Sequence, residues 1–530
     1  MMKVMVTRLT VLSLLLGVVV IGLSCHSKKS NSLGVNTDLT KKGKIKQLIP
    51  FDCALIEAFY VKYPKLIPYK KQVVEIYKKQ GYYYIWFDGK GIKETAAVIS
   101  DKISNLDRDG ISSLAPYKPI FNAVYQRKSL KPNLEIELFL TSYYLFYVDK
   151  VLLGIEDAKS KELGWYLPRK EQSYVAYLDS ILADPAKIEE KHLITQYYKL
   201  KEVLQKYRDI EKKGGWATIK TDSTFVALKP KDSAIMISQI RTRLFLSGDI
   251  SKDSKNPVYD NELQQGILMY KKRNGFNSDY VILPKHIASM NIPISQRIKT
   301  IIVNMERCRW VSKDISKAKE YIVINIPSFK LVYFKDEKPA LASSVVVGKV
   351  MNETVIFSGE LSYIVFDPYW NVPTSILNKE IIPAIKKDKN YLTKHNMEWH
   401  NGGVRQRPGL DNSLGLVKFL FPNNNNIYLH DTPAKNLFNA ETKAFSHGCI
   451  RVEKPKELAN LILKDDPKWT PEKIEETMNK NKESWYALKH KIPVYIGYFT
   501  SWVDDNGNIN FYKDIYDRDS RLEEMLLEDK

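Results

Sequence analysis

One cysteine of this sequence lies among residues that could make it a nucleophile. Cys449 follows a His-Gly pair in the segment AFSHGCIRVEKP, and His430 stands upstream in IYLHDTP. A cysteine that attacks a carbonyl needs a base or a positive neighbour to form its thiolate, and hydrogen-bond donors where the oxyanion develops. The two segments together contain groups of each kind. They predict a covalent step at the Cys449 sulfur.

Two other interpretations of the same residues stay open. Cys449 could be a buried cysteine that lies beside a histidine by chance. His430, His447 and Cys449 could also bind zinc, because imidazole and thiolate are zinc ligands. The sequence has no Cys-x-x-Cys or His-x-x-x-His pair to support a metal site, however, and no evident acidic fourth ligand. We therefore expect no metal and no organic cofactor.

The elements that must position these residues are predicted to be strands. From about Glu320 the sequence changes to runs rich in β-branched and aromatic residues, separated by turns. His430 ends one such strand, and Cys449 lies on a turn that leads toward a helix starting near Pro455. Residues 318–515 are thus expected to form a β-rich domain with a helical insertion at about 374–402, followed by a charged tail at 516–530.

The residues before this domain read mainly as helices. Residues 46–230 carry apolar residues at three- and four-residue spacing, and their acids and lysines are expected on solvated helix faces. Residues 235–310 form a smaller helical unit. The fold class expected for the whole chain is α+β multidomain.

The N-terminus is typical of an export signal. Lys3 and Arg8 precede an apolar run that ends in Gly22-Leu23-Ser24-Cys25. The cysteine after small residues resembles the lipobox of bacterial lipoproteins, although Gly22 stands where leucine is usual. This resemblance implies a signal peptide at 1–25, a lipid on Cys25, and a flexible tether at 26–45. An uncleaved membrane anchor is the alternative, and it also places the rest of the chain outside the cytoplasm. Localisation is then periplasmic, at the inner or outer membrane.

Export makes the cysteine count informative. With Cys25 lipidated, the remaining cysteines are Cys53, Cys308 and Cys449, an odd number, so at least one thiol has no intramolecular partner. Cys53 and Cys308 could form a disulfide, which leaves Cys449 as the best candidate for a free thiol.

Charge excludes little by itself. The formal net charge is +20, but the excess is lysine spread along the chain, without a dense basic block or a nucleic-acid motif. We expect no nucleic-acid partner.

The segment IYLHDTPAKNLFNAETKAFSHGCIRVEKP resembles the signature of L,D-transpeptidases. The resemblance continues through VVVGK, FDPYWNVP and RPGLDNSLGLVKFLFPN, which are similar to the larger periplasmic branch of that family. It implies that a helical scaffold and a three-helix peptidoglycan-binding-like module precede the catalytic domain. It also implies that Cys449 is the nucleophile and His430 the general acid/base. The carbonyl of Asp431 would orient His430, and the amides of His447, Gly448 and Cys449 would bind the oxyanion.

The resemblance further implies residues that bind substrate. Arg451 would lower the pKa of Cys449 or hold a substrate carboxylate; a structural ion pair with Glu453 or another acid is the alternative. The insertion at 374–402 would be a mobile lid. The remaining substrate-binding candidates, for some of which core packing is an equal alternative, are Tyr428, Trp370, Asn371, Arg407 and Ser446.

The implied reaction is acyl transfer on peptidoglycan. Cys449 would cleave the L,D bond of a tetrapeptide donor, and the side-chain amine of a diamino acid on a neighbouring stem would accept the acyl group as a 3→3 cross-link. Carbapenems are expected to acylate the cysteine, and a monomer is expected. Water or a free D-amino acid as acceptor, or a non-catalytic wall-binding lipoprotein, are the alternatives. Thr354-Val355 departs from the Thr-Pro that the family commonly has.

Overall fold

The computed structural model describes residues 37–38, 46–126, 131–169, 173–183 and 192–527. The predicted signal peptide with Cys25 lies outside the described residues. So does the predicted tether, apart from the two-residue strand β1 (Thr37–Asp38), which pairs with β2 (Lys46–Gln47). The described chain divides into two compact units, residues 1–96 with 116–142, and residues 97–115 with 143–530.

The first unit is mostly helical. Its elements are α1 (Ala54–Lys62), η1 (Pro64–Tyr69), α2 (Lys70–Lys79), β3 (Phe87–Asp88), β4 (Gly91–Ile92), the start of α3 (Glu94–Ser104), α4 (Lys118–Tyr125) and the start of α5 (Leu134–Tyr147). One acid of this unit departs from the expectation of solvated helix faces. Glu137 is fully buried on α5, and its carboxylate accepts hydrogen bonds from the Tyr77 hydroxyl and the Ile85 amide. Burial raises the pKa of Glu137 to about 7. This carboxylate anchors the segment around Ile85 to α5.

The helical run that begins with α5 is long and apolar enough, by length and composition, to cross a membrane. It covers Leu134–Glu162, and 78% of its most apolar window is buried. Such burial is typical of a core helix in a folded domain.

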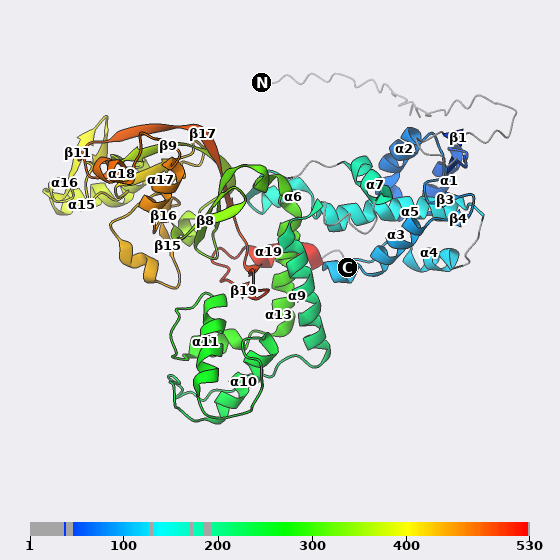
Figure 1. Ribbon diagram of the computed structural model, residues 1–530, viewed down its shortest axis with the longest axis horizontal. Helices are drawn as coiled ribbons and strands as arrows, with labels where there is room; N and C mark the ends of the chain where they lie inside the picture. The colour runs from blue at the N-terminus through cyan, green and yellow to red at the C-terminus, as the bar shows by residue number, and fades with distance from the viewer. Residues whose placement is uncertain (1–36, 39–45, 127–130, 170–172, 184–191, 528–530) are drawn as a thin grey trace, which may run out of the picture. The chain divides into compact units, whose positions relative to one another are not determined.

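The second unit contains a layer of helices and a β-rich domain (Figure 1). Its helices before residue 320 are η2 (Leu106–Asp109), η3 (Val148–Leu153), α6 (Asp157–Glu162), α7 (Tyr174–Ala183), α9 (Thr195–Lys212), α10 (Ile235–Ser247), α11 (Asn261–Arg273), α12 (Pro284–Met290), α13 (Ile294–Trp310) and η5 (Lys313–Lys317). Helices α9 and α13 lie side by side, and the buried Arg309 guanidinium lies 3.3 Å from the Tyr197 hydroxyl.

Helices α10 to α12 share a core of their own. Ile240, Leu263 and Ile287 are among the buried residues that pack there. The helices α11 and α13 fall within the sequence runs from which a three-helix module is predicted. Its assignment as a peptidoglycan-binding-like module stays a prediction.

A closed sheet forms the centre of the β-rich domain. Its strands are β5 (Trp165–Tyr166), β6 (Glu320–Asn325), β7 (Lys330–Lys335), β8 (Lys338–Gly348), β9 (Ile356–Phe366), β13 (Val417–Leu420), β14 (Leu429–His430), β15 (Ala444–Ser446), β16 (Ile450–Val452) and β17 (Ser484–Gly497). The order is β13-β14-β16-β8-β7-β6-β17-β9-β5, with β15 beside β8. Because β13 also pairs with β9, the order closes on itself. Inward-facing residues such as Ile324, Val346 and Leu429 are fully buried.

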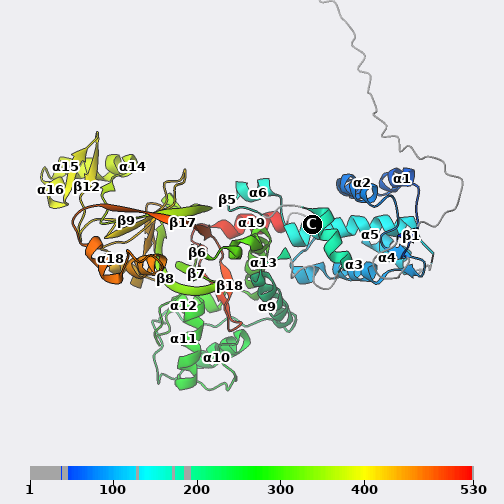
Figure 2. The same cartoon turned by 45° about the horizontal axis from the view of Figure 1, so that its top comes forward.

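A second, small sheet belongs to the insertion. It is built from β10 (Trp370–Asn371), β12 (Gly403–Gln406) and β11 (Met397–His400), with α14 (Thr374–Ile376), η7 (Leu377–Ile381), α15 (Ile382–Lys387) and α16 (Tyr391–Lys394) between β10 and β11. These elements lie together at one edge of the domain in both views (Figures 1 and 2). Their own apolar core includes Val372, Ile381 and Val404. The insertion therefore extends beyond the predicted 374–402 on both sides.

The remaining elements follow or flank the central sheet. They are η6 (Val350–Asn352), η8 (Lys435–Asn439), α17 (Pro455–Leu463), α18 (Pro471–Met478), β18 (Ser501–Val503), β19 (Ile509–Phe511) and α19 (Arg518–Leu527). The predicted charged tail is thus largely the helix α19. The Asp519 carboxylate of this helix forms an ion pair with the Arg307 guanidinium of α13, with an N–O distance of 2.6 Å. The Arg518 guanidinium forms another with the Glu353 carboxylate, also at 2.6 Å. These charges are structural contacts.

Candidate active site

The strand register gathers the candidate residues on one face of the sheet. His430 stands opposite Lys418 of β13 on one side and opposite Arg451 of β16 on the other. Residues directly opposite each other in a sheet point to the same face, and so do residues two apart along a strand. Cys449 precedes Arg451 by two positions, and Tyr428 precedes His430 by two. The five side chains therefore share one face.

The parallel backbone pairing of β14 with β16 extends as far as Cys449. The Ile450 amide donates to the Tyr428 carbonyl at 3.1 Å, just after Cys449. From strand spacing and rise, the α-carbons of His430 and Cys449 are diagonal neighbours roughly 8 Å apart. Their side chains can meet across that distance. In the structure the thiol lies 3.5 Å from the Asn426 carbonyl.

His430 is buried and oriented by the backbone. Its Nδ1 lies 2.5 Å from the carbonyl oxygen of Asp431. A carbonyl oxygen only accepts, so Nδ1 carries the proton and Nε2 keeps its lone pair. Burial, helped by the positive charge of Arg451, lowers the pKa of His430 to about 3, against the opposing effect of the Asp431 and Leu414 carbonyls. The imidazole is therefore neutral at neutral pH and can accept a proton.

The Asp431 side chain holds this segment in place. Its carboxylate accepts from the Leu416 amide at 3.0 Å and from Lys435 at 2.5 Å. Gly415 has φ +61°, and a Cβ there would lie 2.4 Å from the Asp431 carboxylate. A glycine is required at this position by both its backbone conformation and the close approach.

The Cys449 thiol has opposing influences. Burial raises its pKa, while hydrogen bonds from Tyr428 and the charges of Lys418 and Arg451 lower it. Tyr428 is half-buried, with its ring 5.7 Å from the His430 ring, and the pKa of its hydroxyl is raised by burial and by Cys449. Because burial raises the pKa of Cys449 and His430 is neutral, the resting site holds a protonated thiol beside a neutral base.

The turn between β15 and β16 is braced from within. Gly448 has φ +115°, a backbone conformation that side chains disfavour. The buried Ser446 hydroxyl donates to the Cys449 carbonyl at 2.5 Å and accepts from the Gly448 amide at 3.1 Å. Thr354 donates to the Gly448 carbonyl at 2.9 Å and accepts from the Gly348 amide at 2.9 Å. Ser446 therefore holds the turn itself.

The His447 side chain turns away from the sheet. Its Nε2 lies 2.7 Å from Glu380 of η7, in the insertion. The contact joins the insertion to the turn that carries Cys449. The two histidines differ in environment: His430 is buried against Asp431, whereas His447 is exposed.

Arg451 makes no ion pair within the described residues, and its buried Nε has no hydrogen-bond partner there. The Glu453 carboxylate instead accepts from the Ser344 amide at 3.3 Å. In the part of the chain that the structure describes, Arg451 therefore lacks the structural ion pair that the sequence left open. An unused guanidinium donor beside a nucleophile can bind a substrate carboxylate.

Three candidates lie in the insertion. Trp370 packs against the insertion core, and Asn371 is exposed on β10. Arg407 is exposed and pairs with Glu398 at 2.6 Å. None of these contacts involves Cys449, and a role of the three residues in substrate binding stays a prediction.

Lys418 is the residue that the sequence reading missed. Its ammonium lies 4.1 Å from the centre of the Tyr428 ring, and burial lowers its pKa while the Cys449 charge raises it. A lysine in the short strand VKFL does not by itself indicate a site residue. Only its pairing with His430 places it in the site.

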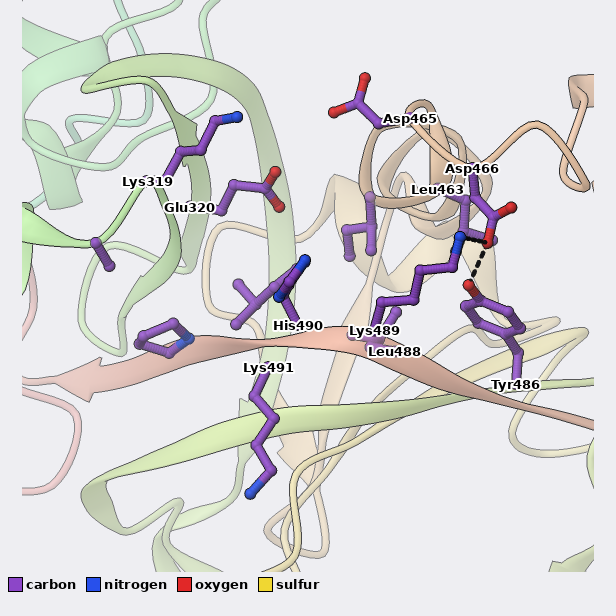
Figure 3. Close-up of a pocket in the computed structure, with 14 residues that line it drawn as sticks. Lys319, Glu320, Leu463, Asp465, Asp466, Tyr486, Leu488, Lys489, His490 and Lys491 are labelled. Atoms are coloured by element: carbon purple, nitrogen blue, oxygen red, sulfur yellow. Dashed lines mark hydrogen bonds and ion pairs between the residues drawn. The ribbon is translucent and has the colours of Figure 1, made fainter.

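A cavity beside α17 is separate from these residues. It has a volume of about 620 Å³ and lies where β17 diverges from β9 (Figure 3). Asp466 there accepts from the Tyr486 hydroxyl at 2.5 Å and pairs with Lys489 at 3.2 Å. Its lining includes none of the predicted site residues. Within the described residues, no group of three or more His, Cys, Asp or Glu side chains could hold a metal ion. Cys308 is a buried thiol of the second unit. Its predicted disulfide with Cys53 stays a prediction.

Comparison with known families decides the assignment. Residues 319–495 match the L,D-transpeptidase catalytic domain, and residues 71–204 match the Scaffold domain. This chain carries an L,D-transpeptidase catalytic domain. The family's catalytic-domain match ends at the second half of β17 and includes the whole face that bears Cys449.

A relative and two solved structures are similar to parts of the chain. The Haemophilus influenzae protein "Putative L,D-transpeptidase" is 36% identical over 222 residues, which are 38% of this chain and 45% of that protein. The chain thus spans less than half of that relative. A Mycobacterium smegmatis L,D-transpeptidase is 10% identical over 34% of this chain and 58% of its own, with a TM-score of 0.20. An Enterococcus faecium L,D-transpeptidase mutant is 14% identical over 34% and 50%, with a TM-score of 0.19. The assignment of the L,D-transpeptidase domain rests on the sequence matches.

Proposed function

We propose that this protein is a cysteine acyltransferase that cross-links peptidoglycan stem peptides. The observation that carries the proposal is the shared face of Cys449, His430 and Arg451 within the matched L,D-transpeptidase catalytic domain. A nucleophile, a neutral base and an unpaired cation are the three groups that acyl transfer from a carboxylated peptide needs.

In the first step the Cys449 sulfur attacks the carbonyl of the third stem residue. The thiol proton passes to His430 Nε2, and then to the nitrogen of the terminal D-alanine as the C–N bond breaks. A thioester remains on Cys449. The Gly448 amide already donates to Ser446, so we assign the oxyanion to the amides of His447 and Cys449.

In the second step the side-chain amine of a diamino acid on another stem attacks the thioester. Its proton goes to His430 Nε2 and then to the departing sulfur, which restores the resting thiol. The new amide is the 3→3 cross-link. Arg451, which has no ion pair among the described residues, would hold the donor carboxylate during both steps. No step requires a metal or an organic cofactor.

Product analysis tests this function. The full chain is incubated with disaccharide-tetrapeptide, and the products are separated and weighed by mass spectrometry. We expect a cross-linked dimer that has lost one D-alanine. Only tripeptide would mean that water is the acceptor, and only exchanged tetrapeptide with added D-amino acid would mean an exchange enzyme. If no product of any kind forms, the remaining alternative is a non-catalytic wall-binding lipoprotein.

Lys418 is expected to tune the thiol. The change Lys418→Met removes a positive charge that lowers the pKa of Cys449, so that pKa rises and less thiolate exists at a given pH. A nearby charge shifts a pKa by roughly one unit or more, and one unit is about tenfold in rate. We expect carbapenem acylation near pH 7 to slow about tenfold, with the pH–rate curve displaced to higher pH.

The matched control for this prediction is Lys418→Arg, which keeps the charge. Stopped-flow acylation across pH 6–10 is the measurement. Equal slowing of both variants with no displacement of the curve would show that Lys418 acts only through packing.

The export and lipidation predictions remain part of the proposal. The signal at residues 1–25 and the lipid on Cys25 would place the enzyme in the periplasm, anchored to a membrane, where its wall substrate lies. The monomeric state stays a prediction.

A further inference from the structure

Helix α1 of the first unit has apolar side chains on two faces. One face packs on α5, where the ring centroids of Phe59 and Phe139 lie 5.1 Å apart and the Tyr60 and Ser142 hydroxyls lie 3.0 Å apart. In both views α1 and α2 lie on one side of α5, and α4 lies on the other (Figures 1 and 2). The face of α1 that turns away from α5 is apolar as well, although a helix that is apolar all round is normally buried on every side.

The outer face of α1 forms an apolar stripe that continues into η1. Residues three apart share one face of an α-helix and are eclipsed in a 3₁₀-helix. Leu55 is 50% exposed, Val61 75% and Ile67 51%. Single exposed apolar residues are ordinary, but a row of them is typical of a surface that binds another apolar surface. The members of the apolar stripe recur every third residue and are all exposed: Leu55, Ala58, Val61, Pro64 and Ile67.

The charge around the apolar stripe is positive. Residues 51–80 contain six lysines and three acids. Two of the lysines have partners, since Lys62 pairs with Glu135 and Lys70 with Glu57, each at 2.6 Å. An apolar row bordered by lysines is typical of a helix that lies in the interface of an anionic membrane. Among the described residues of this segment, the lysines that form no ion pair outnumber the acids that form none: Lys65, Lys71, Lys78 and Lys79 against Asp52 and Glu75.

The predicted anchor brings a membrane within reach of this surface. The predicted lipid site is Cys25, and β1 begins twelve residues later at Thr37. Strand β1 pairs with β2, which belongs to the first unit and ends seven residues before α1 begins. Twelve residues span at most roughly 40 Å, and a folded unit of this size is roughly 30 Å across. The outer face of α1 can therefore meet the bilayer that holds the anchor.

We propose that the apolar stripe, with the lysines beside it, docks the first unit onto the phospholipid bilayer that holds the N-terminal anchor. The inference rests on the proposed function, because the membrane anchor is part of it. The apolar stripe enters the boundary between headgroups and acyl chains, and Lys65 and Lys71 lie among anionic headgroups. An anchor alone limits the distance of the first unit from the membrane. Docking also fixes which face of the unit the membrane covers.

Fluorescence of the full chain in vesicles tests the proposal. The chain carries Cys53→Ala and Cys449→Ala, and its own anchor holds it in vesicles of equal parts phosphatidylethanolamine and phosphatidylglycerol. An environment-sensitive fluorophore is attached at Val61→Cys, while Cys308 is buried and stays unlabelled. We expect the emission to shift to shorter wavelength and to be quenched by nitroxide-bearing lipids. The matched position is Ala123→Cys, exposed on α4, where we expect neither change. The same chain without an added cysteine gives the background.

Two comparisons separate apolar contact from charge. Leu55→Ser with Ile67→Ser should lower the docking equilibrium constant, read from the quenched fraction, by roughly tenfold or more, because two apolar side chains no longer enter the bilayer. The control is Val226→Ser, which changes a 76% exposed valine of the second unit and should leave quenching unchanged. Vesicles of phosphatidylcholine alone should also weaken docking roughly tenfold or more, because Lys65 and Lys71 then lack anionic headgroups.

Three results would overturn the proposal. Absence of quenching at residue 61 would show that the apolar stripe stays outside the bilayer. Equal quenching at residues 61 and 123 would show that the first unit presents no preferred face. Emission that is already shifted without vesicles, and is not quenched with them, would show that protein covers the apolar stripe. Unfolding midpoints check that each variant is folded, and Leu55→Thr with Ile67→Thr replaces the serine pair if that protein is destabilised.

These measurements separate the inference from the proposed function. Quenching is measured in the Cys449→Ala chain, so it does not depend on acyl transfer. A chain that floats with the vesicles but is not quenched at residue 61 contradicts docking alone. A chain that does not float contradicts the anchor and the docking together, while product analysis of the wild-type chain still decides the transpeptidase activity.

Discussion

Replacing Cys449 by alanine is expected to abolish both transpeptidation and acylation by a carbapenem. The sulfur is the atom that forms the thioester, and no other group of the shared face can replace it. Loss of a nucleophile in a covalent mechanism lowers the rate by roughly 10⁴-fold or more, which here means no measurable product. Intact-mass spectrometry of the protein and product analysis are the measurements.

Cys53→Ala is the matched control for the cysteine variant. It removes a thiol of the first unit and should leave the carbapenem adduct in place. An undiminished adduct on Cys449→Ala would contradict the nucleophile assignment and direct attention to another side chain.

Replacing His430 by asparagine is expected to have the second largest effect. The asparagine amide can still donate to the Asp431 carbonyl, but it offers no basic nitrogen to the thiol. A positioned base contributes roughly 10²- to 10⁴-fold, so we expect acylation of Cys449 to slow by that factor. Single-turnover acylation followed by mass spectrometry measures it.

The other histidine provides the contrast. His447→Gln keeps a donor for Glu380 and keeps its backbone amide, so we expect acylation to fall by less than tenfold. A larger loss at His447 than at His430 would reverse the assignment of the base. The pH dependence gives a second check. Because the pKa of His430 is about 3 and that of Cys449 is raised, acylation should keep rising with pH through the ordinary range of a thiol.

The sequence was sufficient for the local features of the site. β-branched and aromatic runs from about Glu320 indicated the strands β6, β7, β8 and β9. The segment IYLHD placed His430 at the end of a strand, and the structure has it there, held by the Asp431 carbonyl. These features depend on short-range patterns, which a sequence contains in full.

Features that depend on long-range pairing were not accessible. Lys418 matters only because β13 pairs with β14 in one register. Glu380 meets His447 because the insertion folds back onto the turn. Burial of Glu137 needs the packing of α5 against distant segments. Trp370 and Arg407 carry residue types that suit a binding site, but the insertion's own sheet determines their contacts.

The central claim is a covalent acyl-enzyme on Cys449. The most direct test incubates the full chain with a tetrapeptide donor, quenches the reaction in acid and maps the protein by digestion and mass spectrometry. The account predicts the mass of a tripeptide acyl group on the peptide that contains Cys449. Cross-linked product formed by Cys449→Ala, or a tripeptide adduct on any other residue, would contradict it.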